Sequence, residues 1–214
     1  MKYSFVHVKN KEILDKIHRF RYRVYEEMGW MDASPDGKDG IETDIYDNYC
    51  NQFAILNANG EICCTMRLIY NSPVGYPTEE YLAPNQIPQQ LDRSKLAEMS
   101  RIFIDPRYRN MRETRIFIIS IVKSLAYEKI KEHGIEYCYG LLEPSFIKLV
   151  NIFKIPYEPI CDLKQVYNKL KYPSILSVKD LEKLNPQLEK YWETHKKVSV
   201  FHLDTKLKPE QIII

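Results

Sequence analysis

The sequence lacks the cysteine patterns that mark disulfide-rich or metal-binding proteins. Its five cysteines form no CxxC pair, their number is odd, and they show no ligand spacing with the five histidines. Cysteines of this kind predict buried, reduced thiols rather than a disulfide framework. We therefore expect no bound metal and a cytoplasmic chain.

Long apolar runs are also absent. No stretch approaches the roughly 20 apolar residues that span a bilayer. The opening segment, MKYSFVHVKNKEILDK, has no uninterrupted apolar core of the kind found in signal peptides. We expect no membrane span.

No charge of one sign dominates the composition. Lys and Arg total 31 against 29 Asp and Glu, which leaves a net charge of +2. This balance argues against nucleic acid as a partner. At 214 residues the chain is long enough to bury a sizeable core. No repeat or domain boundary is visible, so residues 1–214 are predicted to form a single domain.

Apolar periodicity predicts a mixed order of helices and strands. In chain order we expect a strand at 4–8, a helix at 13–28, a flexible loop at 31–40, strands at 52–57 and 61–70, an irregular proline-containing segment at 71–95, a strand at 96–104, a helix at 112–132, a strand at 135–142, a helix at 144–153, a strand at 155–161, a helix at 177–194 and a strand at 198–203. This order suits an α+β fold with helices packed on both faces of a sheet.

Three separated segments concentrate charge where packing alone does not require it. They read RYRVYEEMGW from Arg21, ETDIYD from Glu42 and EMSR from Glu98, and Arg67 adds a charge inside an apolar strand. Charges in a strand or on a buried helix face are costly unless they are paired. We therefore expect the arginines Arg21, Arg67 and Arg101 to form ion pairs with Glu42, Asp44, Asp47 or Glu98. Glu98 could be such a partner or a base. A purely structural network and a substrate site both remain possible.

The spacing of Glu98 and Arg101 predicts an irregular strand. Strict alternation would send side chains three residues apart to opposite faces of the sheet. A β-bulge between Glu98 and Ile104 would bring both to one face and would leave a backbone amide unpaired.

Four blocks in order, RYRVYEEMGW, ETDIYD, CCTMRLI and EMSRIFI, resemble the acyl-homoserine-lactone (autoinducer) synthases. The block SRIFIDPRYRN extends a second resemblance, to the N-acyl amino acid synthases, as far as Asn110. Both resemblances imply a GNAT-like fold with a mixed, mostly antiparallel central sheet.

The resemblance implies an N-acyltransferase. The acyl group would come from an acyl-carrier protein or CoA thioester, and the acceptor would be the amine of S-adenosylmethionine or of an amino acid. These molecules would be substrates, with no tightly bound cofactor. By motif position, the charged catalytic residues would be Asp44, Asp47, Glu98 and Arg101, and the substrate-binding residues would be Arg21, Tyr25, Trp30, Glu42 and Arg67. A CoA-dependent N-acetyltransferase and a non-catalytic acyl- or carrier-binding module remain alternatives.

Two further groups of residues are assigned to the acyl donor. Ordinary acetyl-CoA GNAT enzymes place glycines after this strand, and those glycines expose amides to the pyrophosphate. Here RYRNMRETR replaces them. The arginines Arg107, Arg109, Arg112 and Arg115 would instead bind phosphopantetheine or an acidic carrier protein, or would be solvated surface. The aromatic residues Trp30, Phe103, Phe117 and Phe146 would line an acyl tunnel or belong to the core.

Overall fold

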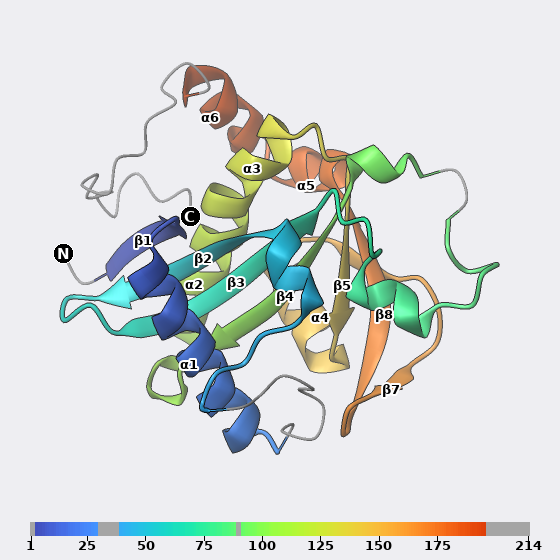
Figure 1. The fold of residues 1–214 in the computed structure, drawn as a ribbon. Coiled ribbons are helices and arrows are strands. Elements are labelled where there is room, and N and C mark those ends of the chain that lie inside the picture. Colours follow the sequence, from blue (N-terminus) through green and yellow to red (C-terminus); the bar gives the residue numbers. More distant parts are fainter. Residues whose placement is uncertain (1–2, 30–38, 89–90, 196–214) are drawn as a thin grey trace.

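The computed structural model describes residues 3–29, 39–88 and 91–195. Within them an eight-stranded sheet has the order β1-β2-β3-β4-β5-β8-β6, with β7 paired to β8 (Figure 1). The strands are β1 (Tyr3–Val8), β2 (Cys50–Asn57), β3 (Ile62–Tyr70), β4 (Leu96–Ile104), β5 (Tyr137–Leu142), β6 (Tyr157–Pro159), β7 (Lys164–Val166) and β8 (Lys169–Ser177). Neighbouring strands are antiparallel except β4 and β5, which are parallel.

Helices cover both faces of this sheet, as predicted. The helices are α1 (Lys11–Glu27), α2 (Met111–Ser120), α3 (Tyr127–Glu132), α4 (Pro144–Ile152), α5 (Val178–Leu184) and α6 (Gln187–His195). A π-helical turn, Ile121–Ala126, joins α2 to α3, so the helix predicted at 112–132 is one continuous helical run. In Figure 1, α1 crosses one face of the sheet and α2 and α3 lie against the other. None of the helices described is long and apolar enough to cross a bilayer.

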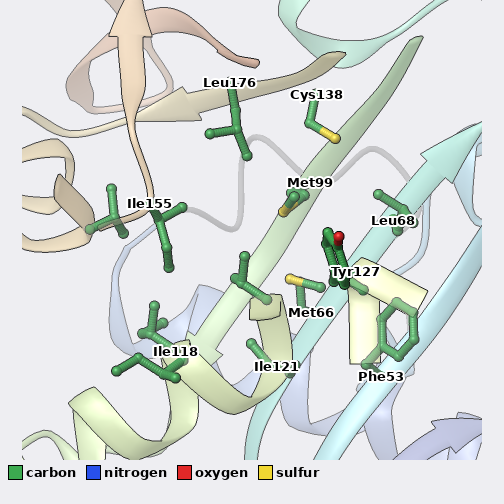
Figure 2. Close-up of a cluster of buried hydrophobic side chains, with 14 of the residues drawn as sticks. Phe53, Met66, Leu68, Met99, Ile118, Ile121, Tyr127, Cys138, Ile155 and Leu176 are labelled. Atoms are coloured by element: carbon green, nitrogen blue, oxygen red, sulfur yellow. The ribbon is translucent and has the colours of Figure 1, made fainter. Parts of the chain in front are cut away.

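The main hydrophobic core lies on the face covered by α2 and α3. Figure 2 shows Met66 and Leu68 of β3 and Met99 of β4 meeting the helical residues Ile118, Ile121 and Tyr127. On the opposite face α1 buries Ile17, Phe20 and Val24 against Ala54 and Ile62. Alternate residues of β2 therefore serve two different layers, because Phe53 and Ile55 belong to the main core whereas Ala54 packs with α1.

Some predicted elements differ from those observed. The helix expected at 177–194 is interrupted at Asn185 and Pro186, because proline lacks an amide hydrogen and clashes with the preceding turn. The strand expected at 155–161 shortens to three residues, and β7 and β8 were not predicted. The segment 71–95 is irregular as expected, with short 3₁₀ helices at Pro77–Tyr81 (η3) and Arg93–Lys95. The strand expected at 198–203 and most of the loop expected at 31–40 lie outside the described residues.

The predicted bulge is present in β4. Ser100 pairs with Arg67 and Phe103 pairs with Thr65, so two residues of β4, Arg101 and Ile102, stand opposite one residue of β3. Arg101 has a φ of 54°, in the left-handed region that costs a non-glycine residue about 1 kcal/mol or more. Beyond Glu98 the register between β4 and β5 ends, and the two strands separate.

Candidate active site

A cavity of about 660 Å³ opens where β4 and β5 separate. Its wall combines residues of α1, the segment 42–46, η3, β4, the β5–α4 junction and the β7–β8 hairpin. The chain thus brings together segments that lie more than a hundred residues apart in sequence. Parallel strands that diverge in this way leave backbone and side chains accessible between them.

Arg21 is the centre of the charge network beside this cavity. It is fully buried on α1, on the same face as Ile17 and Val24. Its Nε donates to Glu42, and its Nη1 and Nη2 donate to the two carboxylate oxygens of Asp47 at 2.8 and 3.0 Å. This bidentate arrangement compensates the cost of burying the guanidinium.

Two further arginines complete the network from the sheet. Arg67 of β3 donates to both oxygens of Asp44, at 2.5 and 2.9 Å, and to Ser100 Oγ at 3.0 Å. Arg101, aimed by the bulge, donates to Glu42 at 2.8 and 3.1 Å and to Asp44 at 2.7 Å. Three arginines and three carboxylates therefore converge as predicted, and their formal charges cancel.

The carboxylates of this network are held ionised. Burial opposes the ionisation of Glu42, Asp44 and Asp47, but the neighbouring guanidinium groups outweigh it and lower the pKa of each. Local sequence also places them. Asp44 accepts from the amide of Tyr46 at 2.9 Å, and Asp47 accepts from the amide of Asp44 at 2.9 Å, which forms a capping box on the 3₁₀ helix Ile45–Tyr49.

Glu98 has a different environment from the other acidic residues. It is 1% exposed, and its carboxylate accepts from the backbone amide of Thr78 at 2.9 Å. Burial raises the pKa of Glu98 to about 8, and the Thr78 amide offsets the rise only in part. Two roles were open for Glu98, partner of an arginine or base. The side chains of Arg67 and Arg101 donate to Asp44, Glu42 and Ser100, so neither forms an ion pair with Glu98.

The aromatic residues divide between cavity and core. Tyr25 lies under Arg101, with its ring centroid 5.2 Å from the guanidinium carbon, and packs edge-on against Phe103. Both line the cavity, as does Phe146. Phe117 instead packs against Tyr3 in the core. Trp30 lies outside the described residues.

The four arginines after β4 stand apart from the charge network. Arg107, Arg109, Arg112 and Arg115 are all exposed around the start of α2. Arg107 is held by Asp105 at 3.0 Å, and Arg109, which lines the cavity, donates to the carbonyl of Ile104 at 2.8 Å. The side chain of Asn110 accepts from the amides of Arg112 and Glu113, both at 3.1 Å. Two of the first amides of α2 are thus already occupied.

Several cavity residues were not found from the sequence. Glu80 accepts a hydrogen bond from the hydroxyl of Tyr46 at 2.6 Å, and both line the cavity. Tyr167 and Lys171 reach it from the β7–β8 hairpin. β7 has only three residues, and Pro173 lies in the middle of β8, where a proline argues against a strand, so the hairpin was not predicted.

Comparisons with solved structures identify this architecture. The AHL synthase LasI superposes with a TM-score of 0.68 at 14% identity, over 86% of this chain and 94% of LasI. BjaI, a CoA-dependent acyl-homoserine lactone synthase solved with SAM and isopentyl-CoA, gives 0.66 at 16% identity, over 88% of this chain and 89% of BjaI. FeeM, an N-acyl amino acid synthase from uncultured soil microbes, gives 0.62 at 14% identity, over 89% and 97%. Likeness at such low identity establishes the fold, which is GNAT-like as predicted.

A comparison of sequences identifies the family. No curated protein sequence matches the chain significantly. The family profile described as "N-acyl amino acid synthase FeeM", however, matches residues 16–176, which include the network residues, Glu98 and most of β8. The chain therefore belongs to the N-acyl amino acid synthase FeeM family and is an N-acyltransferase.

Proposed function

We propose that this enzyme transfers a fatty acyl group from an acyl-carrier protein to the amine of an amino acid. The observation that carries the proposal is one cavity that joins the buried carboxylate of Glu98 to the apolar side chains Phe103 and Phe146. An amine nucleophile needs a proton acceptor, and an acyl chain needs an apolar wall. Both are present where β4 and β5 separate.

Glu98 is the proposed general base. The attacking amine must lose a proton as its nitrogen bonds to the thioester carbonyl carbon, and the thiolate then leaves as the free thiol. A carboxyl with a pKa of about 8 is a stronger base than an ordinary glutamate and is partly ionised near neutral pH. The edge of β4 beyond Glu98, which has no register with β5, would supply backbone amides for the oxyanion.

The charge network is proposed to position rather than to react. Each carboxylate of Glu42, Asp44 and Asp47 already accepts from at least one guanidinium. A fixed, neutral cluster next to the cavity would hold Arg101 and the bulge in place while the acceptor binds. The ion-paired side chains of the network would then also form part of the acceptor-binding wall.

A carrier protein is the proposed donor because of the start of α2. In a helix that binds a pyrophosphate, the first amides point at the anion. Here Asn110 already accepts from two of them. The exposed arginines around this point suit an acidic protein surface instead.

Thiol release separates the possible reactions. The purified enzyme would be given dodecanoyl-carrier protein or dodecanoyl-CoA with each of the L-amino acids or with S-adenosylmethionine, and products would be identified by mass. We expect release with the carrier protein and an amino acid. An acyl-homoserine lactone as the sole product would reassign the acceptor, and equal turnover with CoA would overturn the carrier assignment. Absence of thiol release with every pair would contradict acyl transfer.

A further inference from the structure

Lys171 occupies a defined position in the wall of the cavity. It lies on β8 next to the last β5–β8 pair, Leu142 with Tyr172, and Glu143, the residue that follows β5, is near enough to favour its charge. By strand alternation it shares a face with Ile175, which packs in the cluster that contains Tyr46 and Ile69. This is the face of the sheet that carries the charge network.

Lys171 and Arg101 are linked by aromatic rings across the cavity. The Arg101 guanidinium lies over Tyr25 at 5.2 Å, the rings of Tyr25 and Tyr167 lie 6.3 Å apart, and the Lys171 ammonium lies 5.7 Å from the Tyr167 ring. All four residues line the cavity. Positive charge is therefore present on both the β4 side and the β8 side of the same space.

Both cations have acidic neighbours. Arg101 donates to Glu42 and Asp44. Lys171 lies near Glu143, and Arg101 also lies near enough to disfavour its charge. Burial lowers the pKa of Lys171 to about 8, which indicates an ammonium partly removed from water. A carboxylate brought by a ligand would favour the charged form.

The geometry of attack gives such a ligand its orientation. Glu98 of β4 and Lys171 of β8 line the same cavity, and β5 lies between their two strands in the sheet. A small acceptor whose amine reaches Glu98 therefore shares this space with the Lys171 ammonium. We propose that Lys171 binds the carboxylate of the acceptor and thereby selects amino acids over neutral amines. This inference rests on the proposed N-acylation of a small amine. Lys171 binds substrate and takes no part in proton transfer.

The test compares acceptors that differ only in the carboxylate. The best amino acid from the acceptor panel and its primary amide are assayed with the wild type, Lys171→Met and Lys171→Arg. In Lys171→Met, kcat/KM for the acid should fall about 10- to 100-fold, mainly through KM, because a hydrogen bond to a charged group is lost. Turnover of the amide should stay within about threefold. Lys171→Arg should keep a preference for the acid.

Two variants control for structural effects. Lys169→Met removes a lysine from the same strand and the same side of the alternation, but outside the cavity wall. Glu143→Gln removes the acidic residue near Lys171. Both should retain the acid preference. An unchanged ratio of acid to amide in Lys171→Met, or an equal loss for both acceptors, would overturn the proposal.

A binding measurement keeps this inference separate from acyl transfer. N-dodecanoylglycine and its amide are titrated calorimetrically into the wild type and Lys171→Met, with no turnover required. The wild type should bind the acid about tenfold or more tightly than the amide, and the variant should bind both alike. This result together with no thiol release would sustain the carboxylate site and reject the transferase. No preference for the acid in the wild type would reject the carboxylate site, whatever the turnover.

Discussion

Two kinds of buried carboxylate lie beside one cavity, and their neighbours determine how they differ. Asp47 accepts from Arg21, which lowers its pKa, whereas Glu98 accepts from a backbone amide and has its pKa raised to about 8. Burial favours the protonated form of both residues, and at Asp47 the guanidinium groups of Arg21 and Arg67 outweigh it. This contrast separates a positioning residue from a candidate base.

Replacing Glu98 with glutamine should remove a pH-dependent step. As pH rises through about 8, Glu98 ionises, so kcat/KM of the wild type should rise in that range. Glu98→Gln should be slower by about 100-fold or more and should lose this rise. The pH profile of thiol release checks the prediction, and an identical profile in both enzymes would count against Glu98 as the base.

The same substitution should change how stability depends on pH. Between the ordinary pKa of a glutamate, 4.5, and about 8, the folded chain holds a proton on Glu98 that the unfolded chain has lost. The free energy of unfolding contributed by this group therefore falls as pH rises through that window. Glu98→Gln should flatten the decline. Chemical denaturation at several pH values gives the free energy of unfolding of both proteins. Parallel plots of that free energy against pH for the wild type and Glu98→Gln would contradict the raised pKa.

Replacing Asp44 with asparagine should destabilise the fold as well as lower activity. Arg67 is fully buried, and its bidentate partner would lose its charge. Removing one member of a buried ion pair costs about 3 kcal/mol or more of the free energy of unfolding. Arg93→Gln, which breaks a pair with Glu79 whose arginine is half exposed, should cost less than about 1 kcal/mol. Equal urea midpoints for the two variants would refute the buried role of Asp44.

At the scale of elements, the start of α2 is built differently from an anion-binding helix. Asn110 caps it with two hydrogen bonds, and the flanking arginines lie outside that cap. The element therefore offers cationic side chains where amides would otherwise face a phosphate. Variants at the start of α2 can therefore test whether the enzyme prefers acyl-CoA or acyl-carrier protein, without changing Glu98.

Asn110→Gly should improve the use of acyl-CoA. Glycine at an N-cap costs only a few tenths of a kcal/mol relative to asparagine, and it frees the amides of Arg112 and Glu113. The KM for dodecanoyl-CoA should fall relative to that for the carrier protein. Asn10→Gly removes the corresponding cap of α1 and should leave the ratio unchanged. A shared shift in both variants would show a general effect of helix capping.

The double change Arg112→Glu and Arg115→Glu should weaken the carrier protein selectively. Both side chains are exposed, and reversed charge would repel an acidic carrier surface. We expect the KM for acyl-carrier protein to rise about tenfold or more, with a small change for acyl-pantetheine. Steady-state kinetics with both donors decides it, and an unaltered KM for the carrier protein would remove these arginines from the docking surface.

At the scale of the whole molecule, we propose that residues 1–214 fold as one domain. The sheet runs without interruption from β1 to β6, and one hydrophobic cluster includes residues of β1, β4, β5 and β8. Cooperative packing of this kind predicts one unfolding transition. Far-ultraviolet circular dichroism and tyrosine fluorescence should give coincident urea curves, and two separated midpoints would indicate separate folding units.

Much of the fold was determined by the sequence itself. Helical periodicity placed α1 and the run from α2 to α3, and the strand patterns at 52–57 and 61–70 placed β2 and β3. The spacing of Glu98 and Arg101 predicted the bulge, because alternation along a strand is a local rule. The cost of burying Arg21 and Arg67 predicted their ion pairs, since an unpaired guanidinium in an apolar layer is unfavourable.

Other features were decided only by the tertiary structure. Which carboxylate meets which arginine depends on how α1 and the segment 42–47 lie against the sheet, so Glu98 could not be distinguished from Asp44 by sequence. Lys171 and Tyr167 enter the cavity because β8 pairs with β5, and a pairing between strands distant in sequence leaves no local signal in either strand. Periodicity reports which face of an element is buried, whereas the neighbours on that face are set by long-range packing.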